Sequence, residues 1–176
     1  DAVEKAKEQL HVAYNNSWWH GTQISYGMRG LVTFKGSLYS FNEDGSDGAL
    51  EFKTNHTFGN TYNLESRDSA WYKATRQLLN NNSKINVVIW CWENGVSNAK
   101  STDIDTYLSL MTKLETDFPN VKFVYMTGHL DGTSTSDNLW LRNEQIRNYC
   151  KSNNKILFDF ADIESYDPDG TFLATN

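Results

Sequence analysis

Apolar segments of strand length alternate with helical segments along most of this chain. The apolar runs cover residues 10–14, 85–92, 121–126 and 155–163. Apolar side chains recur at helical spacing over residues 69–79, over 103–118, and in a segment that opens at Asp137 or Asn138. A β-α-β-α-β-α-β order of this kind predicts a parallel sheet wrapped by helices through right-handed crossovers.

The first third of the chain is less regular. We expect a short helix over residues 2–9 and a second helix that runs from the turn at Gly21 to Met28. Residues 31–66 are rich in Gly, Asn, Ser and Asp, and they predict one edge strand, from pieces at 38–41 and 49–52, with long loops. The expected fold is a three-layer α/β/α sandwich of the flavodoxin type, with strand order 2-1-3-4-5 and one domain over residues 1–176.

Length and charge narrow the classes of function. The chain has 176 residues, 39% of them hydrophobic and 22% charged, which fits one globular domain with a real core. Its net charge is −6 and no segment concentrates Lys and Arg, so nucleic-acid and anionic-membrane partners are disfavoured. No apolar stretch approaches the ~20 residues needed to span a bilayer. A mature secreted chain would begin as this one does, and we expect an extracellular protein.

The cysteines and glycines give no sign of a cofactor. Cys91 lies inside an apolar run and Cys150 near the end of a helix, and we interpret both as buried free thiols. Metal-type cysteine spacing, a phosphate-binding glycine loop and a dinucleotide-binding fingerprint are all missing from the sequence. We therefore expect a protein without metal or cofactor.

Polar residues follow the expected strands at the points where the strands end. Ser17 comes after the first run, Glu93 and Asn94 after the second, and His129 after the third. Because the carboxyl ends of parallel strands share one edge of the sheet, these side chains are expected in one crevice. A serine, an amide and a histidine in one crevice indicate acyl or ester chemistry.

Each of these residue types suits one part of that chemistry. Ser17 precedes a helix whose free N–H groups would stabilise an oxyanion, and Gly21 lets the backbone pass close to a substrate. Asn94 would donate its neutral amide to the same oxyanion. His129 is the best general base, with Asp131 nearby to orient it.

Other residues near these strand ends have alternative roles. His20 could be a second base, Glu93 could act as base or acid if desolvated, and Asp159 and Asp162 could orient a histidine or hold a loop. The remaining candidates would shape a substrate pocket, and they are Trp18, Trp19, Gln23 and Trp92.

The block from Ser17 to Gly21 resembles the first block of the SGNH (GDSL-type) hydrolases, Gly-Asp-Ser-x-x-x-Gly, with Asn in place of its first two residues. Asn94 matches the family's oxyanion asparagine by position. The segments 86–90, 120–132 and 155–170 also look like those of extracellular SGNH-like proteins of bacteria and archaea. The family's Asp-x-x-His pair after the last strand is replaced here by carboxylates without a histidine. The resemblance implies the SGNH variant of the flavodoxin-like fold and a serine esterase.

The first hypothesis is therefore a metal-independent serine esterase that cleaves a small or carbohydrate-linked ester. A second hypothesis is a non-catalytic domain that binds a carbohydrate in a degenerate or rebuilt hydrolase crevice. A third is general-base chemistry by Glu93 in an aromatic pocket. The distances among Ser17, Asn94 and His129 would discriminate between them.

Overall fold

The computed structural model describes residues 2–15, 20–54, 70–90, 95–131 and 137–173. Its strands form one six-stranded sheet in which every neighbouring pair is parallel, in the order β2-β3-β1-β4-β5-β6. The strands are β1 (His11–Asn15), β2 (Phe41–Asn42), β3 (Leu50–Lys53), β4 (Val87–Trp90), β5 (Lys122–Met126) and β6 (Ile156–Phe158). The predicted α/β class with a parallel sheet is confirmed.

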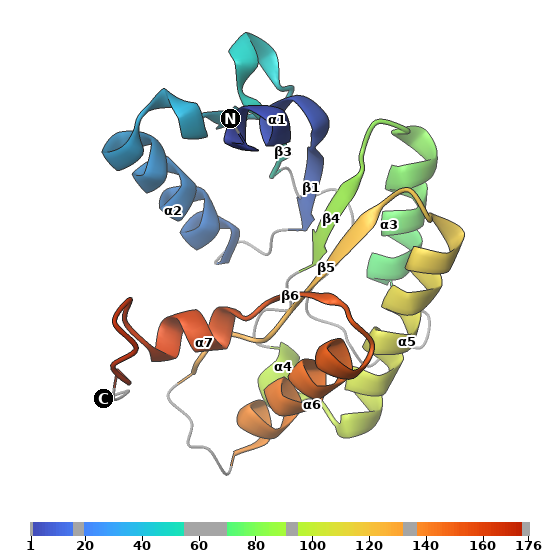
Figure 1. The fold of residues 1–176 in the computed structure, drawn as a ribbon. Coiled ribbons are helices and arrows are strands. Elements are labelled where there is room, and N and C mark those ends of the chain that lie inside the picture. Colours follow the sequence, from blue (N-terminus) through green and yellow to red (C-terminus); the bar gives the residue numbers. More distant parts are fainter. Residues whose placement is uncertain (1, 16–19, 55–69, 91–94, 132–136, 174–176) are drawn as a thin grey trace.

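Helices cover both faces of this sheet (Figure 1). They are α1 (Ala2–Gln9), α2 (His20–Lys35), α3 (Ala70–Asn81), α4 (Gly95–Asn98), α5 (Ser101–Asp117), α6 (Asn138–Ser152) and α7 (Phe160–Ser165). Two short 3₁₀ helices, η1 (Ser37–Tyr39) and η2 (Ser46–Gly48), lie near β2 and β3. The result is the expected α/β/α sandwich.

Two apolar clusters divide the strand residues between the faces of the sheet, as the two-residue period of a strand requires. Val88 and Trp90 of β4 are fully buried in the cluster that α3, α5 and α6 complete, where the Trp90 ring lies 4.5 Å from that of Trp71. Val87 and Ile89 point to the other cluster, to which α2 contributes Ile24 and Met28. Figure 1 shows α3 and α5 on one side of the sheet and α2 on the other.

The strand order extends the predicted one by an extra strand. The predicted order 2-1-3-4-5 corresponds to β3-β1-β4-β5-β6, and β2 adds an edge beyond β3. The two strand-like pieces expected to make one edge strand form two parallel strands, with Phe41 paired to Leu50. Helix α2 also continues seven residues past Met28, through Gly30 to Lys35.

The last strand was predicted too long. Residues 155–163 were expected to be one strand, but β6 ends at Phe158 and α7 begins at Phe160. Asp159 causes the change, because its side chain accepts a hydrogen bond from the N–H of Asp162 and caps the new helix. The prediction of a strand over residues 159–163 is therefore wrong.

Two expectations from the sequence concern the state of the cysteines and the length of apolar helices. Cys150 is a buried free thiol, and burial raises its pKa to about 12. Cys91 lies outside the described residues. Within the described ranges, no helix is both long enough and apolar enough to pass through a bilayer.

Candidate functional site

The order in which the chain adds strands to the sheet reverses at β1. From β1 the chain continues to β2 and β3 on one side, and it then crosses to β4 on the other side. Asn15, the last residue of β1, is the registered partner of Trp90, the last residue of β4. The carboxyl ends of β1 and β4 therefore lie one strand spacing apart, at the topological switch point where open α/β sheets bind their ligands.

The two segments that follow β1 and β4 in the sequence, 16–19 and 91–94, contain six of the predicted site residues. Ser17, Trp18, Trp19, Trp92, Glu93 and Asn94 lie outside the described residues. The backbone of His20, Gly21 and Gln23 forms the first turn of α2, although their side chains are not described. The 16-residue helix α2 thus begins three residues after Ser17, and its first N–H groups lack helical partners.

The loop after β5 passes close to α4. A Cβ atom on Gly128 would lie 2.7 Å from Cβ of Val96, so a side chain at position 128 does not fit. Val96 is two residues beyond Asn94, and Gly128 is adjacent to His129. The start of α4, which follows Asn94 in the sequence, is therefore packed against the residue that precedes His129.

Buried Asn143 of α6 fixes the backbone before His129. Its amide oxygen accepts from the N–H of Gly128 at 2.8 Å, and its amide nitrogen donates to the carbonyl of Gly128 at 3.1 Å. Only 1% of Asn143 is exposed, so both bonds are shielded from water. The position from which His129 projects is therefore set by the core rather than by the loop alone.

A carboxylate that was not among the predicted residues lies beside His129. Glu164 of α7 accepts a 2.7 Å hydrogen bond from the N–H of Leu130. Burial raises the pKa of Glu164, and the Leu130 hydrogen bond and the positive charge of protonated His129 oppose that rise. Asp131 and Asp162, the predicted orienting carboxylates, are both exposed.

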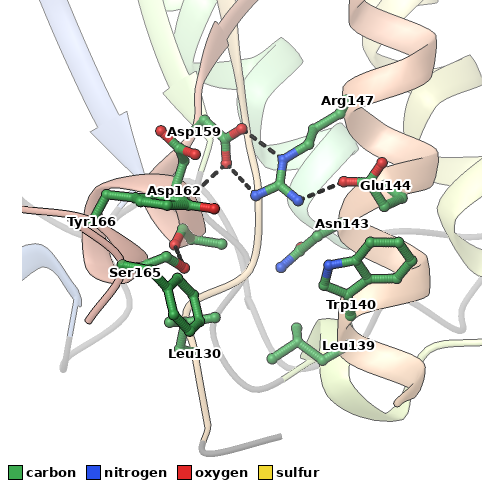
Figure 2. Close-up of a pocket in the computed structure, with 12 residues that line it drawn as sticks. Leu130, Leu139, Trp140, Asn143, Glu144, Arg147, Asp159, Asp162, Ser165 and Tyr166 are labelled. Carbon is green, nitrogen blue, oxygen red and sulfur yellow. Dashed lines mark hydrogen bonds and ion pairs between the residues drawn. The ribbon is translucent and has the colours of Figure 1, made fainter. Parts of the chain in front are cut away.

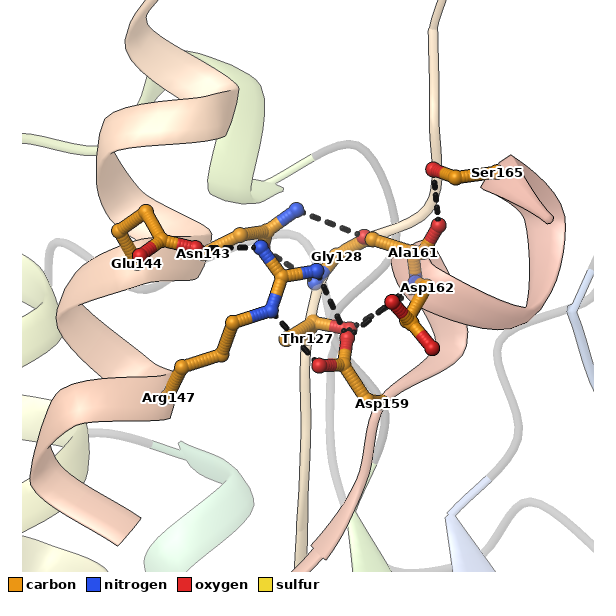
Figure 3. A network of polar contacts seen from close by, with 9 residues as sticks. All are labelled: Thr127, Gly128, Asn143, Glu144, Arg147, Asp159, Ala161, Asp162 and Ser165. Carbon is orange, nitrogen blue, oxygen red and sulfur yellow. Dashed lines mark hydrogen bonds and ion pairs between the residues drawn. The ribbon is translucent and has the colours of Figure 1, made fainter. Parts of the chain in front are cut away.

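An ion-pair network joins α6 to the ends of β5 and β6 (Figure 3). Arg147 donates to both carboxylate oxygens of Asp159, from Nε at 2.6 Å and from Nη2 at 2.9 Å. It also donates to Glu144 at 2.7 Å, and Thr127 donates to Asp159 at 3.0 Å. Asp159 thus holds a loop, which was one of its two predicted roles.

The charges of this network are mutually stabilised. Burial alone would raise the pKa of Asp159, but the hydrogen bonds and charge of Arg147 outweigh it and lower that pKa below its usual value. Burial alone would lower the pKa of Arg147, but the hydrogen bonds and charges of Asp159 and Glu144 outweigh it and raise that pKa above its usual value. Both groups stay ionised, so the network is a fixed support and not a proton donor.

A cavity of about 440 Å³ opens against this network (Figure 2). Leu130, next to His129, forms part of its wall. Its other lining residues are Leu139, Trp140, Asn143, Glu144, Arg147, Asp159, Ala161, Asp162, Ser165, Tyr166 and Phe172. Asp159 and Asp162, both predicted to orient a histidine or hold a loop, therefore line this cavity.

In the described part of the chain, no group of three or more His, Cys, Asp or Glu side chains is arranged to hold a metal ion. The polar arrangement around β5 and β6 is instead one of hydrogen bonds and ion pairs. Such an arrangement can orient a histidine and bind a polar ligand.

Comparisons of the chain with models of known protein families, with curated proteins and with solved structures give no match. The relation to the SGNH hydrolases therefore rests on the residues that resemble them. The fold and the geometry at the sheet edge carry the functional argument.

Proposed function

We propose that this protein is a serine esterase that cleaves a small or carbohydrate-linked ester. One observation supports this most: the segments with Ser17, Asn94 and His129 follow three consecutive strands of the sheet, β1, β4 and β5. Their described neighbours are in contact, through the pair Asn15 and Trp90 and through the packing of Gly128 on Val96.

In the proposed mechanism, the Oγ atom of Ser17 attacks the ester carbonyl carbon. His129 removes the hydroxyl proton as the new C–O bond forms. The imidazolium that results is positive, and the carboxylate of Glu164 beside it favours that charge. Glu164 acts through His129 and is a positioning residue.

The developing oxyanion needs hydrogen-bond donors that are already in place. The side-chain amide of Asn94 and the free N–H groups in the first turn of α2 would supply them. Collapse of the tetrahedral intermediate breaks the bond to the alcohol, which leaves with the proton from His129. Water then attacks the acyl-enzyme, with His129 again as the base, and releases the acid and free Ser17.

Hydrolysis of p-nitrophenyl acetate, followed by absorbance, tests this proposal. We expect turnover by the native protein and a loss of at least about 10³-fold in kcat/KM for Ser17→Ala. Ser109→Ala is the matched control, because Ser109 is exposed on α5 away from the sheet edge. Equal rates for native protein and Ser17→Ala, or no turnover by folded native protein, would reject the esterase.

A further inference from the structure

The cavity beside Leu130 has the size of a ligand site. Its volume of about 440 Å³ falls within the range of ~300–1,000 Å³ typical of small-molecule pockets. It lies beyond the carboxyl ends of β5 and β6, and Leu130 connects it directly to His129. A molecule that fills it would therefore extend toward the proposed catalytic edge.

Aromatic rings stand partly exposed around this cavity. Trp140 of α6 is 39% exposed, and Tyr166 and Phe172, whose rings meet edge to face at 5.4 Å, are 44% and 58% exposed. Figure 2 shows Trp140 and Tyr166 on opposite sides of the pocket. The electron-rich face of such a ring attracts weakly positive C–H groups, which is how an aromatic wall holds the face of a sugar ring.

The polar wall offers both donors and acceptors. Among the described residues, Arg147 uses three of its five N–H donors, two on Asp159 and one on Glu144. The carboxylates have further lone pairs, and Ser165 donates its hydroxyl to the carbonyl of Ala161 and keeps its own lone pairs. Hydroxyl groups both donate and accept, so a polyol can use both kinds of partner at once.

The charged side chains that line the cavity narrow the class of ligand further. Glu144, Asp159 and Asp162 place three carboxylates around one guanidinium, so the lining is net negative and repels anions. A simple cation would meet the Arg147 guanidinium and would leave its free donors unused. A neutral, hydroxyl-rich ring satisfies the aromatic faces, the donors and the acceptors together.

We propose that this cavity is a subsite for a neutral pyranose ring, the alcohol part of a carbohydrate ester. Its connection to ester cleavage rests on the proposed function, but binding of the sugar does not. The sugar ring would lie between Trp140 and Tyr166, with its hydroxyls on Arg147 and Asp162. The ester group would point past Leu130 toward His129.

Saturation-transfer NMR on the Ser17→Ala protein tests the subsite without turnover. The probes are methyl β-glucopyranoside, methyl β-xylopyranoside, cellobiose, xylobiose and chitobiose, with tetramethylammonium and glucuronate for comparison. We expect at least one neutral sugar to receive saturation, strongest at the C–H protons of one ring face. Binding only of tetramethylammonium or glucuronate, or no binding at all, would overturn the proposal.

Variants of the residues that line the cavity test whether the sugar binds there. We expect Trp140→Ala and, separately, Phe172→Ala to weaken the affinity for the bound sugar about tenfold. Phe34→Ala is the matched control, because Phe34 is an 84% exposed aromatic residue on α2, outside the cavity. Affinity unchanged in both folded pocket variants would place the sugar elsewhere and overturn the proposal.

The outcomes separate the two proposals. Sugar binding that depends on Trp140, in a protein that fails to cleave p-nitrophenyl acetate, keeps the subsite and rejects the esterase. Cleavage of p-nitrophenyl acetate without binding of any neutral sugar keeps the esterase and rejects the subsite.

Discussion

A histidine and a glutamate lie near each other at each end of the sheet. At the amino end, Nδ1 of His11 in β1 lies 2.6 Å from Oε2 of Glu51 in β3, and Lys53 lies 3.1 Å from the other oxygen of the same carboxylate. At the carboxyl end, His129 follows β5 and Glu164 lies beside it on α7.

The pKa values of the two glutamates are shifted in opposite directions. Burial would raise the pKa of Glu51, but His11 and Lys53 outweigh it and lower that pKa, so Glu51 is a satisfied structural anion. Burial of Glu164 prevails and raises its pKa. Identical residue types therefore serve structure at one end and, in our proposal, catalysis at the end where parallel strands place their ligand sites.

The sharpest test of this comparison removes each histidine. We expect His129→Ala to lower kcat/KM for p-nitrophenyl acetate about 10³-fold, because the general base for Ser17 is lost. His11→Ala should change kcat/KM less than about twofold, since His11 is at the other end of the sheet. Steady-state kinetics measure both, and similar losses in the two variants would contradict the assigned roles.

Gly128 tests the packing of the loop after β5 on α4. In Gly128→Ala the new Cβ would meet Val96 at 2.7 Å and Leu139 at 3.1 Å, so the free energy of unfolding should fall by about 2–3 kcal/mol. Gly30→Ala is the control, because nothing lies within 4 Å of a Cβ there and alanine favours the helix. Urea unfolding compares them, and an equally stable Gly128→Ala would refute the close contact.

Arg147→Met tests the support under the carboxyl edge. Asp159 would lose its main partner while half-buried, at a cost of about 2 kcal/mol in unfolding free energy at pH 7. Because the pKa of Asp159 is lowered in the fold, this stabilisation is complete above about pH 4 and is lost as the pH falls further. The difference between native protein and variant should therefore shrink below pH 4.

Lys53→Met is the matched change at the amino end. Glu51 keeps His11 as a partner, and Lys53 is 34% exposed, so the cost at pH 7 should be below about 1 kcal/mol. A larger loss for Lys53→Met than for Arg147→Met would reverse our ranking of the two ends.

Glu164→Gln tests the carboxylate beside His129. The amide can still accept from Leu130, but the charge beside His129 is gone, so kcat should fall about tenfold at neutral pH. Because burial raises the pKa of Glu164, native activity should decline with acid at a higher pH than an ordinary carboxyl near ~4.3 would give. Glu51→Gln should keep the native pH–rate profile, and a matching change in both variants would exclude a specific role for Glu164.

The alternation of strands and helices was predictable because each element follows a hydrophobic period. Strand β2 was missed because it has two residues and a partner on only one side. The end of β6 was missed because Asp159 caps a helix within an apolar-looking run. The glycines of α2 made its continuation beyond Met28 look unfavourable, although Gly27 and Gly30 remain inside the helix.

The residues of the candidate site likewise divide into those that the sequence predicted and those that it did not. His129 was predicted because strand ends meet at one edge, a property of topology. Glu164, Asn143 and Arg147 were missed because their partners lie 34, 15 and 12 positions away, and sequence spacing does not tell which polar residues meet. The one signal was the string of carboxylates in residues 159–169, from which Asp159 and Asp162 were singled out and Glu164 was not.

Labelling with a fluorophosphonate, which reacts with activated serines, would show whether Ser17 is a nucleophile and whether His129 activates it. Intact mass and peptide mapping would be compared for the native protein, Ser17→Ala, His129→Ala and His11→Ala. We predict one adduct on Ser17, absent from Ser17→Ala, strongly slowed in His129→Ala and formed at the native rate in His11→Ala. No adduct on the folded native protein, or labelling of Ser17 that is as fast without His129, would contradict the account.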